Sequence, residues 1–144
     1  MRSALLDTDI FSEVLKRRDP FVAETADRYL LHHQQLSLTT VTILEMVSGL
    51  HRMERIDRID QLANQLSGHE ILTLNDDNAF LAGRIYAALE QAVQRIGVVD
   101  TVNAAIAIGC GLQLVTGNTK HYQRVIDLGY PLELNNWRQA AASC

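Results

Sequence analysis

The fold is decided by the stretch ALLDTDI, residues 4–10, in which three apolar residues run directly into Asp7. An oxygen-bearing side chain also follows or interrupts an apolar stretch at Glu45, at Asp100 and, as an amide, at Asn118. Apolar stretches favour the protein interior, whereas ionised carboxylates need water or a partner. Repeated acids at the edge of a core therefore predict oxygen ligands that converge around one cation.

Length and composition limit the possible classes of protein. A single domain over residues 1–144 is expected, because a chain of this size buries most of its apolar surface unaided. No apolar run approaches the ~20 residues of a membrane span. Asp7 comes too early for a secretory signal, so a cytoplasmic protein is expected. Cys110 and Cys144 lack the C-x-x-C spacing of zinc or redox sites, and Cys110 is expected in the core.

The formal net charge of −4 argues against a general electrostatic nucleic-acid binder. Any contact with nucleic acid must therefore be local. Each basic cluster, taken alone, is more typical of a solvated helix face than of a phosphate site. The clusters are residues 16–18, the trio Arg52, Arg55 and Arg58, and Lys120 with Arg124.

Short apolar stretches alternate with helical periodicities along the whole chain. The predicted strands are residues 3–6, 36–38, 71–74, 112–115 and 132–134. The predicted helices are residues 9–16, 21–32, a segment from 41, 52–65, 76–95, 101–108 and 119–126. This alternation predicts an α/β fold with three α/β/α layers around a central, mainly parallel sheet.

In such sheets, ligands bind beyond the carboxyl ends of the strands. Asp7 and Asn118 follow strands, and Glu45 and Asp100 lie at or near helix starts that open onto the same edge. Each also has a structural interpretation, because Asp7, Asp100 and Asn118 could cap the next helix and Thr42-x-x-Glu45 matches a capping box. Four such residues in register on one sheet edge favour a site.

Neighbouring side chains extend this candidate site. Asp9 is a competing ligand, ranked below Asp7 because it is better placed to cap or to support. Asn103 shares a helix face with Asp100 and needs polar company. The other supporting candidates are the hydroxyls of Thr8 and Thr116 and the cations of Arg52, Lys120 and Arg124. The histidines show no paired spacing typical of zinc, so surface or supporting roles are expected for them.

Four segments in this order resemble the PIN-domain ribonucleases, specifically the VapC-type toxins of bacterial toxin–antitoxin pairs. They are LLDTDI (5–10), TILEMVSG (42–49), DTVNAAIA (100–107) and LVTGNTKHY (114–122). The resemblance covers nearly the whole chain, including Trp137 after the last strand.

The resemblance implies a PIN-like fold and the acidic site residues Asp7, Glu45 and Asp100, with Asn118 where many members have a fourth aspartate. It implies an endoribonuclease that leaves 5′-phosphate and 3′-hydroxyl ends, a homodimer, and a small VapB-like antitoxin. We expect Mg²⁺, or Mn²⁺, to be held by Asp7, Asp100 and Glu45, to polarise an RNA phosphodiester and to activate water for in-line attack. Asn118 leaves open whether one or two ions bind.

Two alternatives compete with this interpretation. The LLDTD segment also resembles the nucleophile strand end of haloacid-dehalogenase-like phosphatases, with Thr116 and Lys120 as later motifs. In that family the metal-binding acids follow the lysine, whereas Asp100 precedes Lys120 here. The second alternative is a catalytically weakened module that binds a partner protein, since Asn118 replaces an acid.

Overall fold

The computed structural model describes residues 1–139. Five strands and seven helices alternate within this part of the chain. The strands are β1 (Ala4–Leu6), β2 (Ser37–Thr39), β3 (Glu70–Leu72), β4 (Gln113–Val115) and β5 (Leu134–Asn135). The helices are α1 (Thr8–Lys16), α2 (Pro20–His33), α3 (Thr40–Arg52), α4 (Ile56–Gln65), α5 (Asp76–Gln91), α6 (Val98–Gly109) and α7 (Thr119–Asp127).

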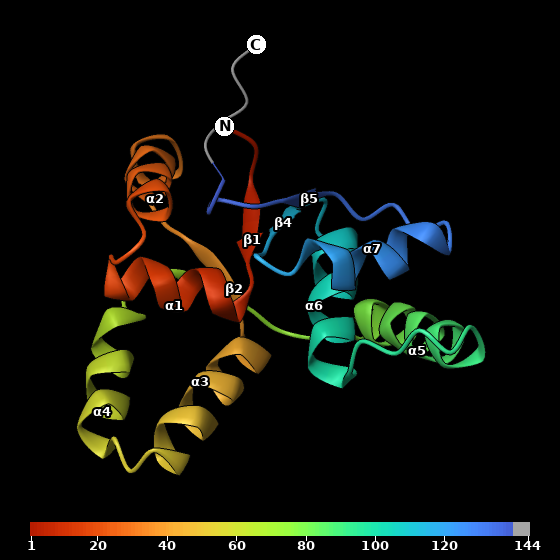
Figure 1. Ribbon diagram of the computed structural model, residues 1–144, viewed down its shortest axis with the longest axis horizontal. Coiled ribbons are helices and arrows are strands. Elements are labelled where there is room, and N and C mark those ends of the chain that lie inside the picture. Colours follow the sequence, from red (N-terminus) through yellow and green to blue (C-terminus); the bar gives the residue numbers. More distant parts are fainter. Residues whose placement is uncertain (140–144) are drawn as a thin grey trace.

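All strand pairs in residues 1–139 are parallel, in two ladders of order β1-β4-β5 and β2-β3. Strand β1 lies beside β2, so the two ladders meet at the centre of the molecule. Figure 1 shows α1 to α4 on one side of the strands and α5 to α7 on the other. The predicted α/β fold with helices on both faces of a parallel sheet is confirmed.

The alternation of side chains along β1 joins these layers. Leu5 packs into a cluster with residues of α5, α6 and α7, whereas Ala4 and Leu6 face a second cluster built on α1 and α2. Successive side chains of a strand point to opposite faces, so the three residues of β1 contribute to both core clusters. A one-residue shift of β1 would exchange the two sets.

Tyr29 of α2 fixes the first residue of β1. Its buried hydroxyl accepts a hydrogen bond from the Ala4 backbone N at 2.9 Å and donates to the Ala4 backbone O at 3.4 Å. The ring stacks on His33 and lies 5.5 Å from the ring of the buried Trp137. A side chain therefore satisfies backbone groups of this short strand that would otherwise be unpaired.

Several predicted boundaries were wrong. The helix expected over 52–65 begins only at Ile56, because the chain turns at Glu54 with a left-handed φ of 57°. Arg52 therefore ends α3. The long helix stops at Gln91 rather than at residue 95, before Val93 adopts a φ of 56°. The last strand is Leu134–Asn135, later than the expected 132–134.

Cys110, expected in the core, is exposed, because α6 ends at Gly109 and Cys110 is its C-cap. Within residues 1–139, every helix is too short or too polar to span a lipid bilayer. The expectation of a single domain over 1–144 stays a prediction, and residues 140–144 lie outside the described residues.

Candidate active site

Asp7 lies at the centre of the candidate site, directly beyond β1. Its backbone N donates to Val115 O of β4 at 2.9 Å, which sets the carboxylate beside the end of β4. The side chain is only 6% exposed. Thr116 Oγ1 donates to one carboxylate oxygen at 2.9 Å, and Asn103 Nδ2 donates to the other at 3.3 Å. The same carboxylate accepts from Thr8 N at 3.0 Å, so Asp7 also caps α1, as the structural interpretation expected.

The carboxyl group of Asp7 is poorly accommodated as an anion. Burial, then the negative charges of Asp9 and Asp100, raise its pKa from 3.8 to about 6, against the opposing hydrogen bonds from Thr116 and Thr8. A raised pKa means that the neutral form is favoured at this position. A cation in the pocket would reverse this preference, because an opposite charge favours the ionised form.

Glu45 is connected to Asp7 through a chain of hydrogen bonds. Its Oε1 accepts from Thr8 Oγ1 at 2.5 Å, and Thr8 Oγ1 also lies 3.3 Å from Thr42 Oγ1. Asn103 Nδ2 reaches Thr42 Oγ1 at 3.5 Å as well as Asp7. The capping box suggested by Thr42-x-x-Glu45 is not formed. The α3 N-cap is Thr39, whose hydroxyl accepts from Thr42 N, so Glu45 is available to the site.

Both ends of the Asn103 side-chain amide are hydrogen-bonded, as expected for an amide buried among apolar residues. Its Oδ1 accepts from Thr39 Oγ1 at 2.6 Å, while its Nδ2 serves Asp7. It is 1% exposed. A buried amide with both ends bonded holds the ends of β1 and β2 in a fixed relation.

Asp100 lies in the first turn of α6, not at its N-cap. Gly97, with a φ of 92°, takes the N-cap position, and α6 begins at Val98, three residues earlier than expected. The Asp100 carboxylate contacts His121 Nε2 of α7 at 3.0 Å, and the same nitrogen lies 2.9 Å from Ile96 O. Because both neighbours are acceptors, Nε2 carries the proton and donates to them.

Asp9 lies at the rim of the same edge. Its Oδ2 accepts from Gly117 N at 2.9 Å and lies 3.7 Å from Arg138 Nη1. A Cβ on residue 117 would fall 2.6 Å from Asp9 Oδ2 and 2.7 Å from Arg138 Nη1. The glycine is therefore required for this close approach. Asp9 is held by these contacts, consistent with its lower rank as a ligand.

The other predicted residues bring no side chain into this network, although Asn118 N donates to Thr116 Oγ1 at 3.0 Å. Asn118 is exposed and precedes α7, but its side chain makes no capping hydrogen bond there. Arg52 is exposed at the far end of α3, where Nη1 donates to Ser48 Oγ. Arg124 Nη1 donates to Arg95 O, and Lys120 is exposed at the start of α7. Their roles in the site stay predictions.

The sequence did not identify two residues of α7, His121 and Tyr122, as specific parts of the site. His121 was expected only in a surface or supporting role, and it contacts Asp100. Tyr122 is fully buried, and its hydroxyl is the single buried side-chain N or O atom found without a hydrogen-bond partner in residues 1–139. Arg138 was also missed, because its contact with Asp9 spans nearly the whole chain. No local pattern distinguishes these side chains from ordinary helix or tail residues.

The donor set fits a hard divalent cation. As they stand, no three acidic, cysteine or histidine side chains of residues 1–139 are arranged to hold an ion together. Asp7 nevertheless has Glu45 linked to it through Thr8 and Asp100 close enough to raise its pKa, and carboxylate oxygens are the ligand type of Mg²⁺ and Mn²⁺. The unpartnered hydroxyl of Tyr122 is a second sign of a missing polar partner.

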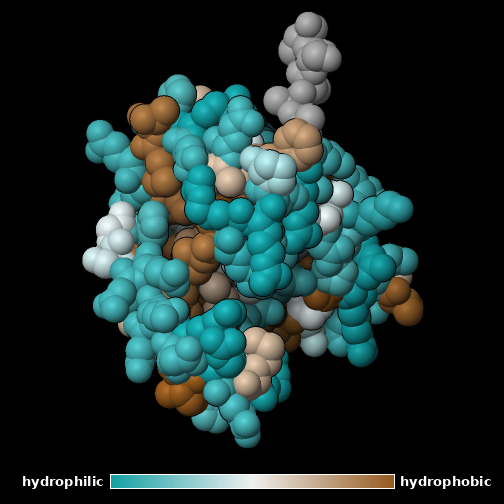
Figure 2. Space-filling model, turned by 60° about the vertical axis from the view of Figure 1, so that its left-hand side comes forward, coloured by the Kyte–Doolittle hydropathy of each residue, from teal (hydrophilic) through white to brown (hydrophobic). Residues whose placement is uncertain are grey.

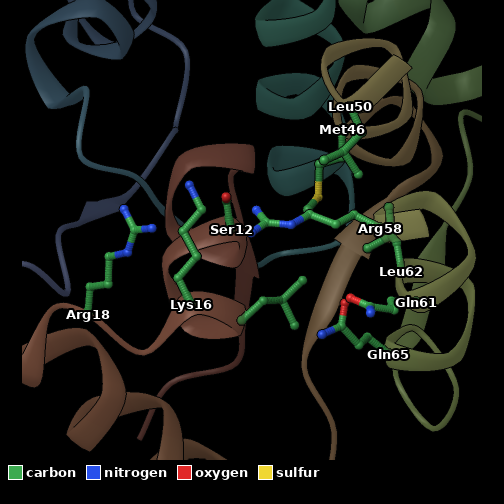
Figure 3. Close-up of a pocket in the computed structure, with 10 residues that line it drawn as sticks. Ser12, Lys16, Arg18, Met46, Leu50, Arg58, Gln61, Leu62 and Gln65 are labelled. Atoms are coloured by element: carbon green, nitrogen blue, oxygen red, sulfur yellow. The ribbon is translucent and has the colours of Figure 1, made fainter. Parts of the chain in front are cut away.

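A separate groove lies along α1 on the side of α3 and α4. It encloses about 310 Å³. Figure 2 shows hydrophobic residues in a hollow of this face with hydrophilic residues around them. Figure 3 shows the Arg58 side chain extending from α4 toward Ser12 on α1. This basic groove is lined by Ser12, Leu15, Lys16, Arg18, Met46, Leu50, Arg58, Gln61, Leu62 and Gln65, without an acid.

Comparison with known proteins identifies the family. The PIN-domain family model matches residues 4–126. Ribonuclease VapC2 of Haemophilus influenzae is 31% identical over 138 residues, which cover 95% of this chain and 99% of that protein. The tRNA(fMet)-specific endonuclease VapC of Shigella flexneri is 27% identical, over 87% of this chain and 93% of that protein.

A solved structure agrees at the level of the fold. VapBC2 from Rickettsia felis, bound to a DNA fragment from its promoter, superposes with a TM-score of 0.77 at 24% identity. The match covers 93% of this chain and 98% of that one. This chain therefore belongs to the PIN-domain family, among the VapC-type ribonucleases.

Proposed function

We propose that Asp7, Glu45 and Asp100 hold a divalent cation, Mg²⁺ or Mn²⁺, at which this chain cleaves RNA internally as the toxin of a toxin–antitoxin pair. The observation that carries the proposal is the buried Asp7 carboxylate, whose pKa of about 6 reflects burial beside Asp9 and Asp100. Such a cluster of like charges is costly unless a cation compensates it. Asn118 remains a candidate fourth member of the site.

A bound divalent ion would supply a Lewis acid for the phosphodiester and lower the pKa of a water molecule. The chain's own residues prepare the pocket for it. Thr116 and Asn103 donate to Asp7 and orient its two oxygens. Thr8 donates to Glu45, and His121 donates to Asp100. Hydrogen-bonded carboxylates of this kind keep a fixed direction toward an ion.

RNA binding must rely on local cations, since the chain carries a formal net charge of −4. Lys120 is exposed at the start of α7, next to the His121–Asp100 contact, and is our first candidate for the RNA phosphate. Arg52 and Arg124 are weaker candidates, because both already donate to other groups. An RNA substrate also implies action in the cytoplasm. We expect 5′-phosphate and 3′-hydroxyl ends.

A VapB-like antitoxin is the expected protein partner, and we propose that it binds in the basic groove. Its floor is apolar, with Leu15, Met46 and Leu62, and its rim carries Lys16 and Arg58. This combination suits a peptide with alternating apolar and acidic side chains.

We also propose a homodimer formed through the outer face of α5. Phe80 is 78% exposed there beside Ala79, Gly83 and Ala87, an apolar surface with small residues that permit close approach. Phe80→Arg should convert the dimer to a monomer in sedimentation experiments. A wild-type protein that sediments as a monomer would contradict this assignment.

The decisive experiment is an RNA cleavage assay with purified protein, with Mg²⁺, with Mn²⁺ and with EDTA, beside Asp7→Asn. We expect cleavage that requires a divalent ion and disappears in the variant. Cleavage in EDTA, or unchanged cleavage by Asp7→Asn, would refute the proposal. A phosphorylated Asp7, trapped with a phosphate ester, would instead support the phosphatase alternative.

A further inference from the structure

Tyr122 combines complete burial with an unused hydroxyl. Its ring is 0% exposed in the core cluster shared by β1, β4 and α6. Its hydroxyl finds no hydrogen-bond partner among the described residues. Burial of a hydroxyl without a partner is costly, and phenylalanine would fill the same space without this cost. The hydroxyl therefore calls for a role that packing does not supply.

The surroundings of this hydroxyl point to the carboxylate pocket. Burial, then the charges of Asp7 and Asp100, raise the pKa of the Tyr122 phenol well above its usual range, so the group remains a donor. The adjacent residue of α7, His121, contacts Asp100 directly at 3.0 Å. The first turns of α7 thus bring His121 to Asp100 and the Tyr122 hydroxyl close to both Asp7 and Asp100.

We propose that Tyr122 is a positioning residue whose hydroxyl donates to the Asp7 and Asp100 carboxylates, directly or through one water, when these are drawn together by a divalent cation. This inference rests on the proposed function. In the cation-free structure the hydroxyl lies near the Asp7 and Asp100 carboxylates but does not meet hydrogen-bond geometry with either. Closure of the pocket brings an acceptor to it, so its hydrogen bond forms only in the cation-bound protein.

A second buried tyrosine provides a matched control. The hydroxyl of Tyr29 is satisfied in the cation-free protein, since it bonds both backbone groups of Ala4. It lies on α2, in the opposite core cluster from Tyr122. Replacement by phenylalanine removes one oxygen atom in each case. The two variants therefore distinguish a hydroxyl that stabilises the fold from one that strengthens the binding of the cation.

The test compares Tyr122→Phe and Tyr29→Phe with the wild type in EDTA and in a titration with Mn²⁺. The readouts are thermal unfolding and calorimetric Mn²⁺ affinity. For Tyr122→Phe we expect an unfolding temperature in EDTA at or above that of the wild type, and Mn²⁺ affinity weakened about tenfold or more. For Tyr29→Phe we expect a lower unfolding temperature in EDTA and unchanged Mn²⁺ affinity.

Wild-type Mn²⁺ affinity in Tyr122→Phe, or a loss of stability in EDTA as large as that of Tyr29→Phe, would overturn the inference while leaving the proposed function intact. If the wild type itself neither binds Mn²⁺ nor cleaves RNA with a divalent ion, both the proposed function and this inference fail. The affinity measurement needs no RNA, so the two failures are distinguishable.

Discussion

Two regions of the molecule share α1 and differ in charge and in solvation. At the start of the helix lies the carboxylate pocket, where Asp7 is buried and Asp100 is close by. Along its side lies the basic groove, where Lys16 and Arg58 surround an apolar floor. The pocket holds its charges against desolvation, so every polar contact there matters. The groove keeps its charges in solvent, where they act on encounter and on the choice of partner.

This difference shows why the net charge of −4 is a poor guide to the chain's partners. Asp7, Asp9 and Asp100 lie together where a cation is expected, whereas Lys16, Arg18 and Arg58 line the groove where an acidic peptide is expected. Substitutions in one region should therefore change its own binding activity and leave that of the other region unchanged.

The largest effect is expected for Asp7→Asn. Loss of one anionic ligand should lower divalent-dependent RNA cleavage by more than about 100-fold. The same change should raise the unfolding temperature of the cation-free protein above about pH 7, because it removes a buried charge whose pKa is raised. Cleavage and calorimetry in EDTA measure both. A variant that is less stable and still active would reverse our account of the pocket.

The next effect concerns the pH dependence of stability without metal. The pKa of Asp7 is about 6 in the folded protein against 3.8 as its ordinary value. Between these values the folded state binds more protons than the unfolded state, so the free energy of unfolding should fall as the pH rises. The fall should be on the order of 2–3 kcal/mol between about pH 4 and pH 7.

Urea unfolding in EDTA at several pH values measures this slope. The Asp7→Asn variant is the control, because it lacks the titrating group and should lose this part of the pH dependence. Excess Mg²⁺ should also flatten the slope, since a bound cation favours the ionised carboxylates. Equal slopes for the wild type and the variant would mean that Asp7 titrates normally.

A smaller effect, confined to the groove, is expected for Lys16→Glu with Arg58→Glu. Reversal of two rim charges should weaken binding of an acidic antitoxin segment by about 10- to 100-fold, mainly at low salt, through slower association. RNA cleavage by the free toxin should not change. Surface plasmon resonance and the cleavage assay give the two readouts. A parallel loss of cleavage would show that RNA also uses this groove.

The smallest effect is expected for Thr116→Val in the pocket. Thr116 Oγ1 donates to Asp7, and this hydrogen bond lowers the pKa of the Asp7 carboxyl. Its removal should raise that pKa further and destabilise the cation-free protein at neutral pH by about 1 kcal/mol. Thr116→Ser, which retains the hydroxyl, should preserve the wild-type pH profile of unfolding. A serine variant that behaves like the valine variant would exclude the hydroxyl as the cause.

Local pattern predicted the parts of the fold in which each residue's role is set by its near neighbours. The buried strands directly before Asp7 and Thr116 follow from such signals. So does helix α2, where Asp19 is a typical N-cap residue and Pro20 suits the first helical position. The break at Glu54 did not, because a left-handed turn there carries no glycine. Nor did the first turn of α6, since Gly97 could equally have ended the preceding segment.

The candidate site divides in the same way. The acids were visible because charge beside an apolar run is unusual at each position separately. Of the groups that hold them, Asn103 and Thr116 were candidates from the sequence, whereas His121 and Tyr122 were not, since these two acquire their contacts only across the fold. Spacing along one helix cannot tell a buried tyrosine whose hydroxyl is satisfied, as in Tyr29, from one whose hydroxyl is not.

The attachment of Ala4 to Tyr29 has a mechanical consequence. Only Leu5 and Leu6 separate that anchor from Asp7, and an extended chain of this length has almost no slack. The hydrogen bonds from Tyr29 of α2 to Ala4 thus help to set the position of the Asp7 carboxylate. An insertion or deletion within Leu5–Leu6 would therefore displace Asp7. It would also exchange the side chains that β1 presents to the two core clusters.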